Sequence, residues 1–206
     1  AMSSAPYLLY LHGFRSSPRS FKARVVQDKL EQAGLGERFI CPQLPASPKA
    51  AMALALELVE RHAPDNLTIV GSSLGGFYAT WLAERLGVRA AVINPSVDPT
   101  RNLSKHVGVT TSWHSDEPFE FRQEYVDELV ALRTASITRP ERYFLLAATG
   151  DEVLDYRDMV AHYAGARQHV IEGSDHAIPE FAQYVDEVLA FCGFGQIGRA
   201  SCRERV

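Results

Sequence analysis

The order of apolar and polar positions divides the chain into short apolar runs separated by amphipathic stretches. The runs are continuous instead of alternating with polar residues, as is typical of strands buried on both faces. The predicted strands are Tyr7 to Leu11, Phe39 to Cys41, Leu67 to Gly71, Arg89 to Ile93, Tyr143 to Ala148 and His169 to Ile171.

Amphipathic patterns between these runs predict helices. After the first strand, Ser17 and Pro18 give a helix-start signal, Val26 and Leu30 share one helical face, and Gly34 ends the helix. The alternation predicts an α/β fold, a mostly parallel sheet with helices on both faces, whose sites lie at the carboxyl ends of the strands. Further helices are expected at about 48–62, 74–86, 156–164 and 179–191.

A long polar stretch from Asp98 to Glu141 interrupts this alternation and contains one helical pattern, from about Arg122 to Arg133. Loops of this length inside a domain are commonly lids or binding loops, so we expect a small lid insertion at about 98–141. Its aromatic side chains are candidates for lining a substrate pocket, with ordinary core packing as the alternative. They are Trp113, Phe119, Phe121 and Tyr125.

Composition narrows the class of protein. The chain has 206 residues, of which 46% are hydrophobic, so residues 1–194 are expected to form a single domain. The net charge of −4 leaves no basic face for nucleic acid. No apolar run is long enough to span a membrane and no signal peptide is recognised, so a cytoplasmic location is expected. Oligomeric state is left open.

Cysteines and the last residues add little to the functional picture. Cys41, Cys192 and Cys202 are widely spaced, which indicates neither a disulfide framework nor a zinc site. The glycine-and-arginine string 195–206 is expected to be a non-native or disordered tail.

One motif carries candidate chemistry: Gly71-Ser72-Ser73-Leu74-Gly75, between a predicted strand and a predicted helix. This is the setting of a Gly-x-Ser-x-Gly nucleophile elbow. A serine on such a strained turn needs glycine two residues before and after it, because side chains there would collide. That spacing fits Ser73 and excludes Ser72, so Ser73 is the candidate nucleophile; a glycine-rich turn without catalysis is the alternative.

A serine nucleophile needs a base and an acid, and in proteins with this kind of elbow they follow the serine in the order acid then histidine. His176 is the histidine in a loop after the last predicted strand, and is therefore the candidate base. Asp151 is the first carboxylate after Tyr143 to Ala148 and is the candidate acid. Glu152 and Asp155 are its competitors, although Asp155 is better placed to cap the next helix.

Acyl transfer also needs donors for the oxyanion, and the backbone N–H groups of Phe14 and Leu74 are the candidates. His12, beside the first of these, is expected to bond to the loop backbone, since no partner ligand stands at metal-binding spacing. The sequence therefore predicts no metal and no cofactor.

These motifs resemble those of the YqiA-like small bacterial esterases of the α/β-hydrolase superfamily. The resemblance rests on the elbow and, more narrowly, on the strings Ser17-Pro18-Arg19-Ser20 and Gly150-Asp151-Glu152-Val153-Leu154-Asp155-Tyr156-Arg157. It runs from about residue 7 to 178, although Ser174-Asp175 and the tail depart from the expected pattern. It implies a three-layer α/β-hydrolase fold that lacks the first two strands of larger hydrolases, with Ser73, Asp151 and His176 as the triad.

The expected activity is hydrolysis of esters of small or short-chain acids through an acyl-enzyme, with a small-molecule ester as the substrate and neither nucleic acid nor a membrane as a partner. A thioesterase or acyltransferase using the same triad is one alternative. A non-catalytic ligand-binding protein on a hydrolase scaffold is another, because a fold alone does not define a function.

Overall fold

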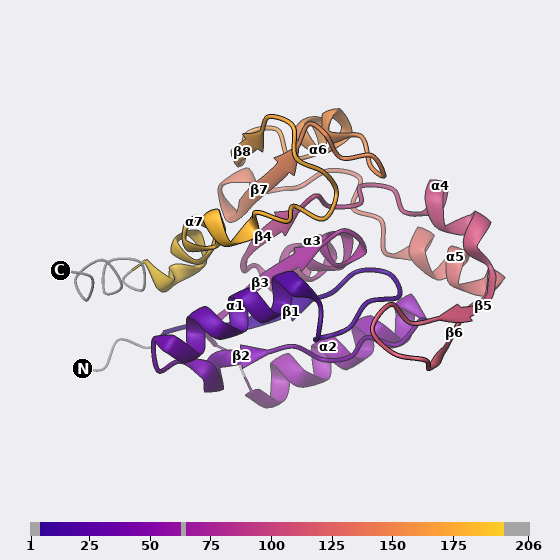
Figure 1. Cartoon of the computed structure of the whole chain (residues 1–206), viewed down its shortest axis with the longest axis horizontal. Helices are drawn as coiled ribbons and strands as arrows, with labels where there is room; N and C mark the ends of the chain where they lie inside the picture. The colour runs from indigo at the N-terminus through magenta and orange to yellow at the C-terminus, as the bar shows by residue number, and fades with distance from the viewer. Residues whose placement is uncertain (1–4, 63–64, 196–206) are drawn as a thin grey trace.

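The computed structural model describes residues 5–62 and 65–195, and a parallel sheet lies at its centre (Figure 1). Within these residues the sheet has six strands in the order β2-β1-β3-β4-β7-β8, and all neighbouring pairs are parallel. The predicted strands are confirmed, with small shifts at the ends of three of them. They are β1 (Tyr7–Leu11), β2 (Phe39–Ile40), β3 (Leu67–Ser72), β4 (Arg89–Ile93), β7 (Tyr143–Ala148) and β8 (Arg167–Ile171).

Helices cover both faces of the sheet, because successive strand side chains point to opposite sides. Leu8 and Tyr10 of β1 pack in the cluster that contains α1 and α7, whereas Leu9 and Leu11 pack in the cluster with α2, α3 and α6. Burying each leucine contributes about 1.5–3 kcal/mol, so both faces of this strand help to hold the layers together. The helices are α1 (Phe21–Gln32), α2 (Pro48–His62), α3 (Leu74–Leu86), α6 (Tyr156–His162) and α7 (Val185–Leu189).

The predicted helix at 179–191 is wrong as a continuous helix. A 3-10 turn, η4 (Phe181–Gln183), precedes α7, and a π-helical turn, η5 (Ala190–Phe194), follows it. The apolar residues of this segment are buried as the pattern predicted, but the backbone folds back in tight turns, with Phe181 N–H bonded to Ile178 O at 3.0 Å. Gly193, at φ 98°, ends the helical geometry. Two further 3-10 turns are η1 (Gly36–Arg38) and η3 (Pro140–Arg142).

The insertion between β4 and β7 has more structure than its sequence predicted. The expected helix is present as α5, but a short helix, a 3-10 turn and an antiparallel hairpin precede it. Together they gather at one end of the molecule, on the right in Figure 1. The elements are α4 (Thr100–Leu103), η2 (Ser104–His106), β5 (Gly108–Thr111), β6 (Pro118–Phe121) and α5 (Gln123–Ala131).

The insertion is anchored to the loop that follows β1. Trp113 N–H donates a 2.8 Å hydrogen bond to the carbonyl oxygen of Arg15, and the Arg15 guanidinium lies 3.9 Å above the Trp113 ring. A second contact joins the insertion to the residue before α2: the Ser47 hydroxyl donates a 2.6 Å hydrogen bond to Glu128 of α5. These contacts fix the insertion against the carboxyl edge of the sheet.

No helix among the described residues is long and apolar enough to cross a membrane. The predicted tail lies almost entirely outside the described residues, as does Cys202.

Candidate active site

Ser73 stands at a sharp turn between β3 and α3. Its backbone has φ 55° and ψ −121°, a conformation that side-chain-bearing residues rarely adopt. Its N–H donates to Ile93 O at 3.0 Å and its carbonyl oxygen accepts from Ser96 N–H at 3.0 Å, so β4 and the loop after it hold the strained turn in place. Such strain persists only where the surrounding structure over-determines it, and it clusters at functional sites.

The two glycines of the motif are required for the steric reason predicted from the sequence. A Cβ on Gly71 would lie 2.1 Å from the carbonyl oxygen of Gly75. A Cβ on Gly75 would lie 1.9 Å from the carbonyl oxygen of Leu11. Both obstacles are backbone atoms of the sheet or helix, which cannot move aside cheaply. The glycines therefore allow α3 to begin directly against the ends of β1 and β3.

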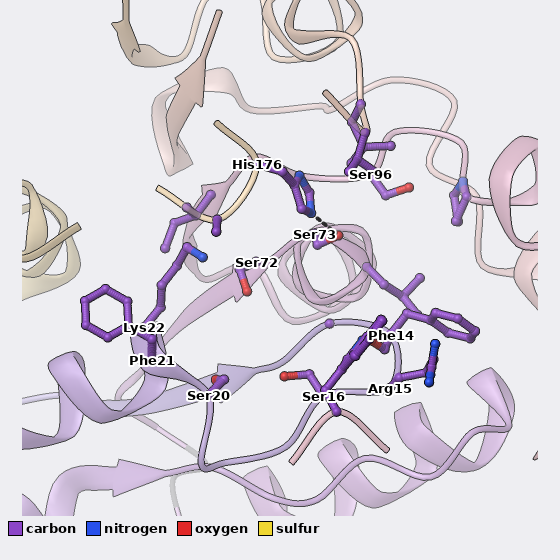
Figure 2. A pocket seen from close by; sticks show the side chains of 18 of the residues that line it. Phe14, Arg15, Ser16, Ser20, Phe21, Lys22, Ser72, Ser73, Ser96 and His176 are labelled. Carbon is purple, nitrogen blue, oxygen red and sulfur yellow. Dashed lines mark hydrogen bonds between the residues drawn. The ribbon is translucent and has the colours of Figure 1, made fainter. Parts of the chain in front are cut away.

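The structure brings the three predicted residues into one hydrogen-bonded line at the carboxyl edge of the sheet. His176 Nε2 lies 3.1 Å from Ser73 Oγ, and His176 Nδ1 lies 2.7 Å from Asp151 Oδ2. Figure 2 shows the imidazole pointing at the serine. With Nδ1–H donating to the carboxylate, Nε2 is left as the acceptor for the serine proton.

Asp151 is held rigidly by its own loop. Its side chain is fully buried, and Oδ1 accepts hydrogen bonds from Val153 N–H and Leu154 N–H, both at 2.8 Å. A carboxylate with one oxygen fixed by backbone donors presents the other in a defined direction. Oδ2 is thereby aimed at His176.

The competing carboxylates have other partners. Glu152 accepts the backbone N–H of His176 at 3.0 Å, which fixes the histidine loop and not the imidazole. Asp155 caps α6 by accepting the Arg157 N–H at 2.9 Å, as predicted. The guanidinium of Arg157 also bonds to Asp155 and lowers the pKa of that carboxyl.

Asn94, which the sequence reasoning did not assign to the site, joins the two loops. Its side chain is 1% exposed and its φ is 40°. The side-chain amide donates to the carbonyl oxygens of Asp175 and His176, and its own oxygen accepts from Ala148 N–H at 2.9 Å. The one available signal was its position directly after a buried strand, next to a proline.

The candidate oxyanion donors, Phe14 and Leu74, line the same cavity as Ser73. Leu74 is the first residue of α3, whose first N–H groups have no partner within the helix. His12 bonds to the backbone as predicted: its Nδ1 lies 2.9 Å from Gly13 O and its Nε2 accepts Leu44 N–H at 2.9 Å. Burial lowers the pKa of His12, in keeping with a neutral ring.

The cavity above Ser73 has a volume of about 780 Å³, within the range of small-molecule sites. Of the four aromatic candidates, Trp113 lines it. The prediction is wrong for Phe119, Phe121 and Tyr125, which do not line this cavity. Phe119 and Phe121, on β6 of the hairpin, are each edge-on to the Phe14 ring, and Tyr125 of α5 packs against Phe121, so the three side chains pack among aromatic neighbours instead.

The chain matches the family described as Uncharacterised protein family UPF0227 over residues 7–193. It belongs to the UPF0227 family. The match agrees with the predicted resemblance to YqiA-like proteins. A UPF0227 protein of Pectobacterium carotovorum subsp. carotovorum strain PC1 is 24% identical over 197 residues, which cover 91% of this chain and 99% of the relative.

Solved structures confirm the α/β-hydrolase fold of this UPF0227 chain. Est1E from Butyrivibrio proteoclasticus with bound ferulic acid superposes with a TM-score of 0.69 at 14% identity, covering 90% of this chain and 88% of that one. Mouse alpha/beta hydrolase domain-containing protein 10 gives 0.67 at 16% identity, with 89% of each chain covered. The esterase domain of a Rhodothermus marinus protein superposes with a TM-score of 0.65 at 16% identity, covering 95% of this chain and 89% of that one.

The cavity above Ser73 also has a polar wall that could not be predicted from the sequence. Ser20 and Lys22, at the start of α1, line it together with Tyr10 and Ser72, and the Tyr10 hydroxyl donates to Ser72 Oγ at 3.2 Å. Burial lowers the pKa of Lys22 to about 8, while the negative charges of Asp175 and Asp151 act in the opposite direction. Among the described residues, no group of three or more His, Cys, Asp or Glu side chains is arranged to hold a metal ion.

Proposed function

We propose that this protein is a serine hydrolase that cleaves esters of small or short-chain carboxylic acids. The observation that carries the proposal is the continuous hydrogen-bonded line from Asp151 through His176 to Ser73, at a strained turn that opens into a cavity. A buried carboxylate, an oriented imidazole and a hydroxyl that lines a cavity are the parts that nucleophilic acyl transfer requires.

In the proposed reaction, Ser73 Oγ attacks the ester carbonyl carbon while His176 Nε2 takes the serine proton. Asp151 keeps the imidazole in the tautomer that can accept this proton and stabilises the imidazolium that forms. The N–H groups of Phe14 and Leu74 bind the negative oxygen of the tetrahedral intermediate. His176 then passes its proton to the leaving alcohol, and an acyl-Ser73 ester remains.

In the second half, a water molecule gives a proton to His176 Nε2 and attacks the acyl-Ser73 carbonyl. Collapse of this intermediate returns the proton to Ser73 and releases the acid. No metal or cofactor takes part. Leu103, His106 and Trp113 of the insertion line the cavity, and we propose that the insertion sets the preference for small acyl groups.

The same array would also cleave a thioester or transfer an acyl group, since it does not select the leaving group. No contact in the cavity favours these alternatives over an oxyester. Parallel assays of an oxyester and a thioester with the same acetyl group would rank them by kcat/KM.

The test is hydrolysis of p-nitrophenyl acetate, butyrate and octanoate at about pH 8 with a metal chelator present. The wild type is compared with Ser73→Ala and with Ser136→Ala, which removes an exposed hydroxyl of no assigned role. Activity that disappears with Ser73→Ala but not with Ser136→Ala supports the proposal. Equal activity in all three proteins would remove Ser73 as the nucleophile, and a preference for octanoate would remove the short-chain assignment.

A further inference from the structure

The polar wall of the cavity is assembled from residues that the acyl-transfer chemistry does not use. Figure 2 shows Lys22 extending from the start of α1 into the space near Ser72, and Ser20 precedes it by two residues on the same segment. The rest of the lining near them is largely apolar, with Phe21, Ala177 and Pro179 in contact with the same space. A few convergent polar groups in an apolar cavity are the features that fix the orientation of a ligand.

The Lys22 amine can donate hydrogen bonds to a ligand. The ion pairs among the described residues do not include it. The two carboxylates whose negative charge acts on Lys22 already have partners. Asp151 bonds to His176 and to two backbone N–H groups, and Asp175 Oδ1 accepts Ile178 N–H at 3.0 Å. Because its pKa of about 8 lies above neutrality, the amine is mostly charged at pH 7.

Ser20 supplies a second donor that lacks a partner. Its Oγ is buried and makes no hydrogen bond within the part of the chain that the structure describes. Ser20 is the residue before α1, yet its side chain does not cap the helix. A buried hydroxyl without a partner is costly, and Ser20 is one of the residues that line the cavity.

The start of α1 adds a third favourable feature. This helix has 12 residues, and the N-terminus of a helix carries a partial positive charge that favours anions. Ser20, Phe21 and Lys22 place that terminus at the cavity wall. The positive charge of the Lys22 amine and the partial charge of the helix terminus both favour an anionic group, such as a carboxylate, at this wall.

We propose that Lys22 and Ser20 form a subsite that binds a carboxylate group carried by the ester substrate, so that the preferred substrates are half-esters or esters with an acidic group. This inference rests on the proposed ester hydrolysis and adds the substrate class. The competing explanation is that Lys22 acts on Asp151 and His176 through its charge alone. That role would affect every substrate equally, whereas a carboxylate subsite affects only acidic ones.

The experiment compares substrate pairs that differ only in a negative charge. One pair places the charge on the alcohol side: 4-acetoxybenzoate and its methyl ester. The other places it on the acyl side: mono-p-nitrophenyl adipate and p-nitrophenyl methyl adipate, with spontaneous hydrolysis subtracted. The proteins are wild type, Lys22→Met, Lys22→Arg, Ser20→Ala and Arg24→Met, the last removing an exposed positive charge from the same helix.

For one of the two pairs, Lys22→Met is expected to lower kcat/KM for the acid by roughly tenfold or more while leaving the methyl ester within about twofold. Ser20→Ala should also lower kcat/KM for the acid, by a smaller factor. Lys22→Arg should retain most of the preference for the acid. Arg24→Met should leave kcat/KM unchanged for both substrates. An acid-to-ester ratio that is unchanged by Lys22→Met in both pairs, or an equal loss on both substrates, overturns the subsite. Two other outcomes would overturn the proposed ester hydrolysis itself: a wild type that cleaves none of these esters, or cleavage that survives Ser73→Ala.

Discussion

The side-chain amide of Asn94 donates a 3.0 Å hydrogen bond to the carbonyl oxygen of His176 and so ties the end of β4 to the loop that carries the imidazole. The same amide reaches the carbonyl oxygen of Asp175 at 3.2 Å, and its oxygen accepts Ala148 N–H at the end of β7. One buried side chain thus couples three segments at the carboxyl edge of the sheet. Asn94 is in this account a positioning residue, because it acts on the chemistry through His176.

Asn94→Ala is expected to lower kcat for p-nitrophenyl acetate by roughly a hundredfold with a smaller change in KM, because a displacement of about 1 Å at the imidazole has that effect. It should also lower the free energy of unfolding by about 1–3 kcal/mol, since Ala148 N–H loses its buried acceptor. Asn94→Asp keeps that acceptor but removes the donor to His176. It should therefore lose kcat as well, and full activity in Asn94→Asp would contradict the positioning role.

Asp151→Asn should reduce kcat by about 10³- to 10⁴-fold, because an amide in this place no longer selects the tautomer that accepts the serine proton. Asp155→Asn is the matched control four residues away, at the start of α6. It should leave kcat unchanged and cost at most about 1 kcal/mol of stability through a weaker helix cap. Steady-state kinetics and urea unfolding measure both. The reverse result would make Asp155 the acid.

Gly75→Ala should destabilise the fold strongly, by at least about 1–3 kcal/mol, because the added Cβ would overlap the backbone of Leu11. Gly36→Ala is the control: its Cβ would meet mainly the flexible Glu31 side chain, 2.9 Å from Cγ. Urea unfolding midpoints should fall far more for Gly75→Ala than for Gly36→Ala. Equal midpoints would show that α3 does not approach β1 as closely as described.

The preference for acidic substrates should depend on pH through Lys22, whose pKa is lowered to about 8. The amine is charged below that pH, so the acid-to-ester ratio of kcat/KM should be highest there and should fall as pH rises through about 8. Asp151, Asp175 and His176 face the same region, and Tyr10 lies on the cavity wall. In Lys22→Met the ratio should be flat with pH, and a wild-type ratio that is flat across this range would contradict the assignment.

The elements that could be predicted from sequence are those with a local signal. Continuous apolar runs identified the strands, and the spacing of Gly71 and Gly75 selected Ser73 over Ser72 for a reason that the backbone contacts confirm. Asp151 and His176 could be assigned because each stands in a loop after a predicted strand, and such loops meet at the carboxyl edge of a parallel sheet, where Ser73 also lies.

What escaped prediction depends on tertiary contacts. Lys22 has the sequence signature of an ordinary polar position on an amphipathic helix, and only the placement of α1 turns it towards the cavity. The hairpin of β5 and β6 consists of short, mostly exposed strands with little apolar periodicity. Phe121 and Tyr125 were proposed for the pocket because an aromatic residue in a long loop looks the same whether it faces a ligand or the core.

The most direct test of the central claim, that Ser73 is an activated nucleophile, is covalent labelling by a fluorophosphonate followed by peptide mass spectrometry. We expect one adduct, on Ser73, in the folded wild type, and labelling that slows by orders of magnitude in Asp151→Asn. No adduct in the folded protein, or an adduct on another serine, would contradict the claim and leave the hydrogen-bonded line without its proposed chemistry.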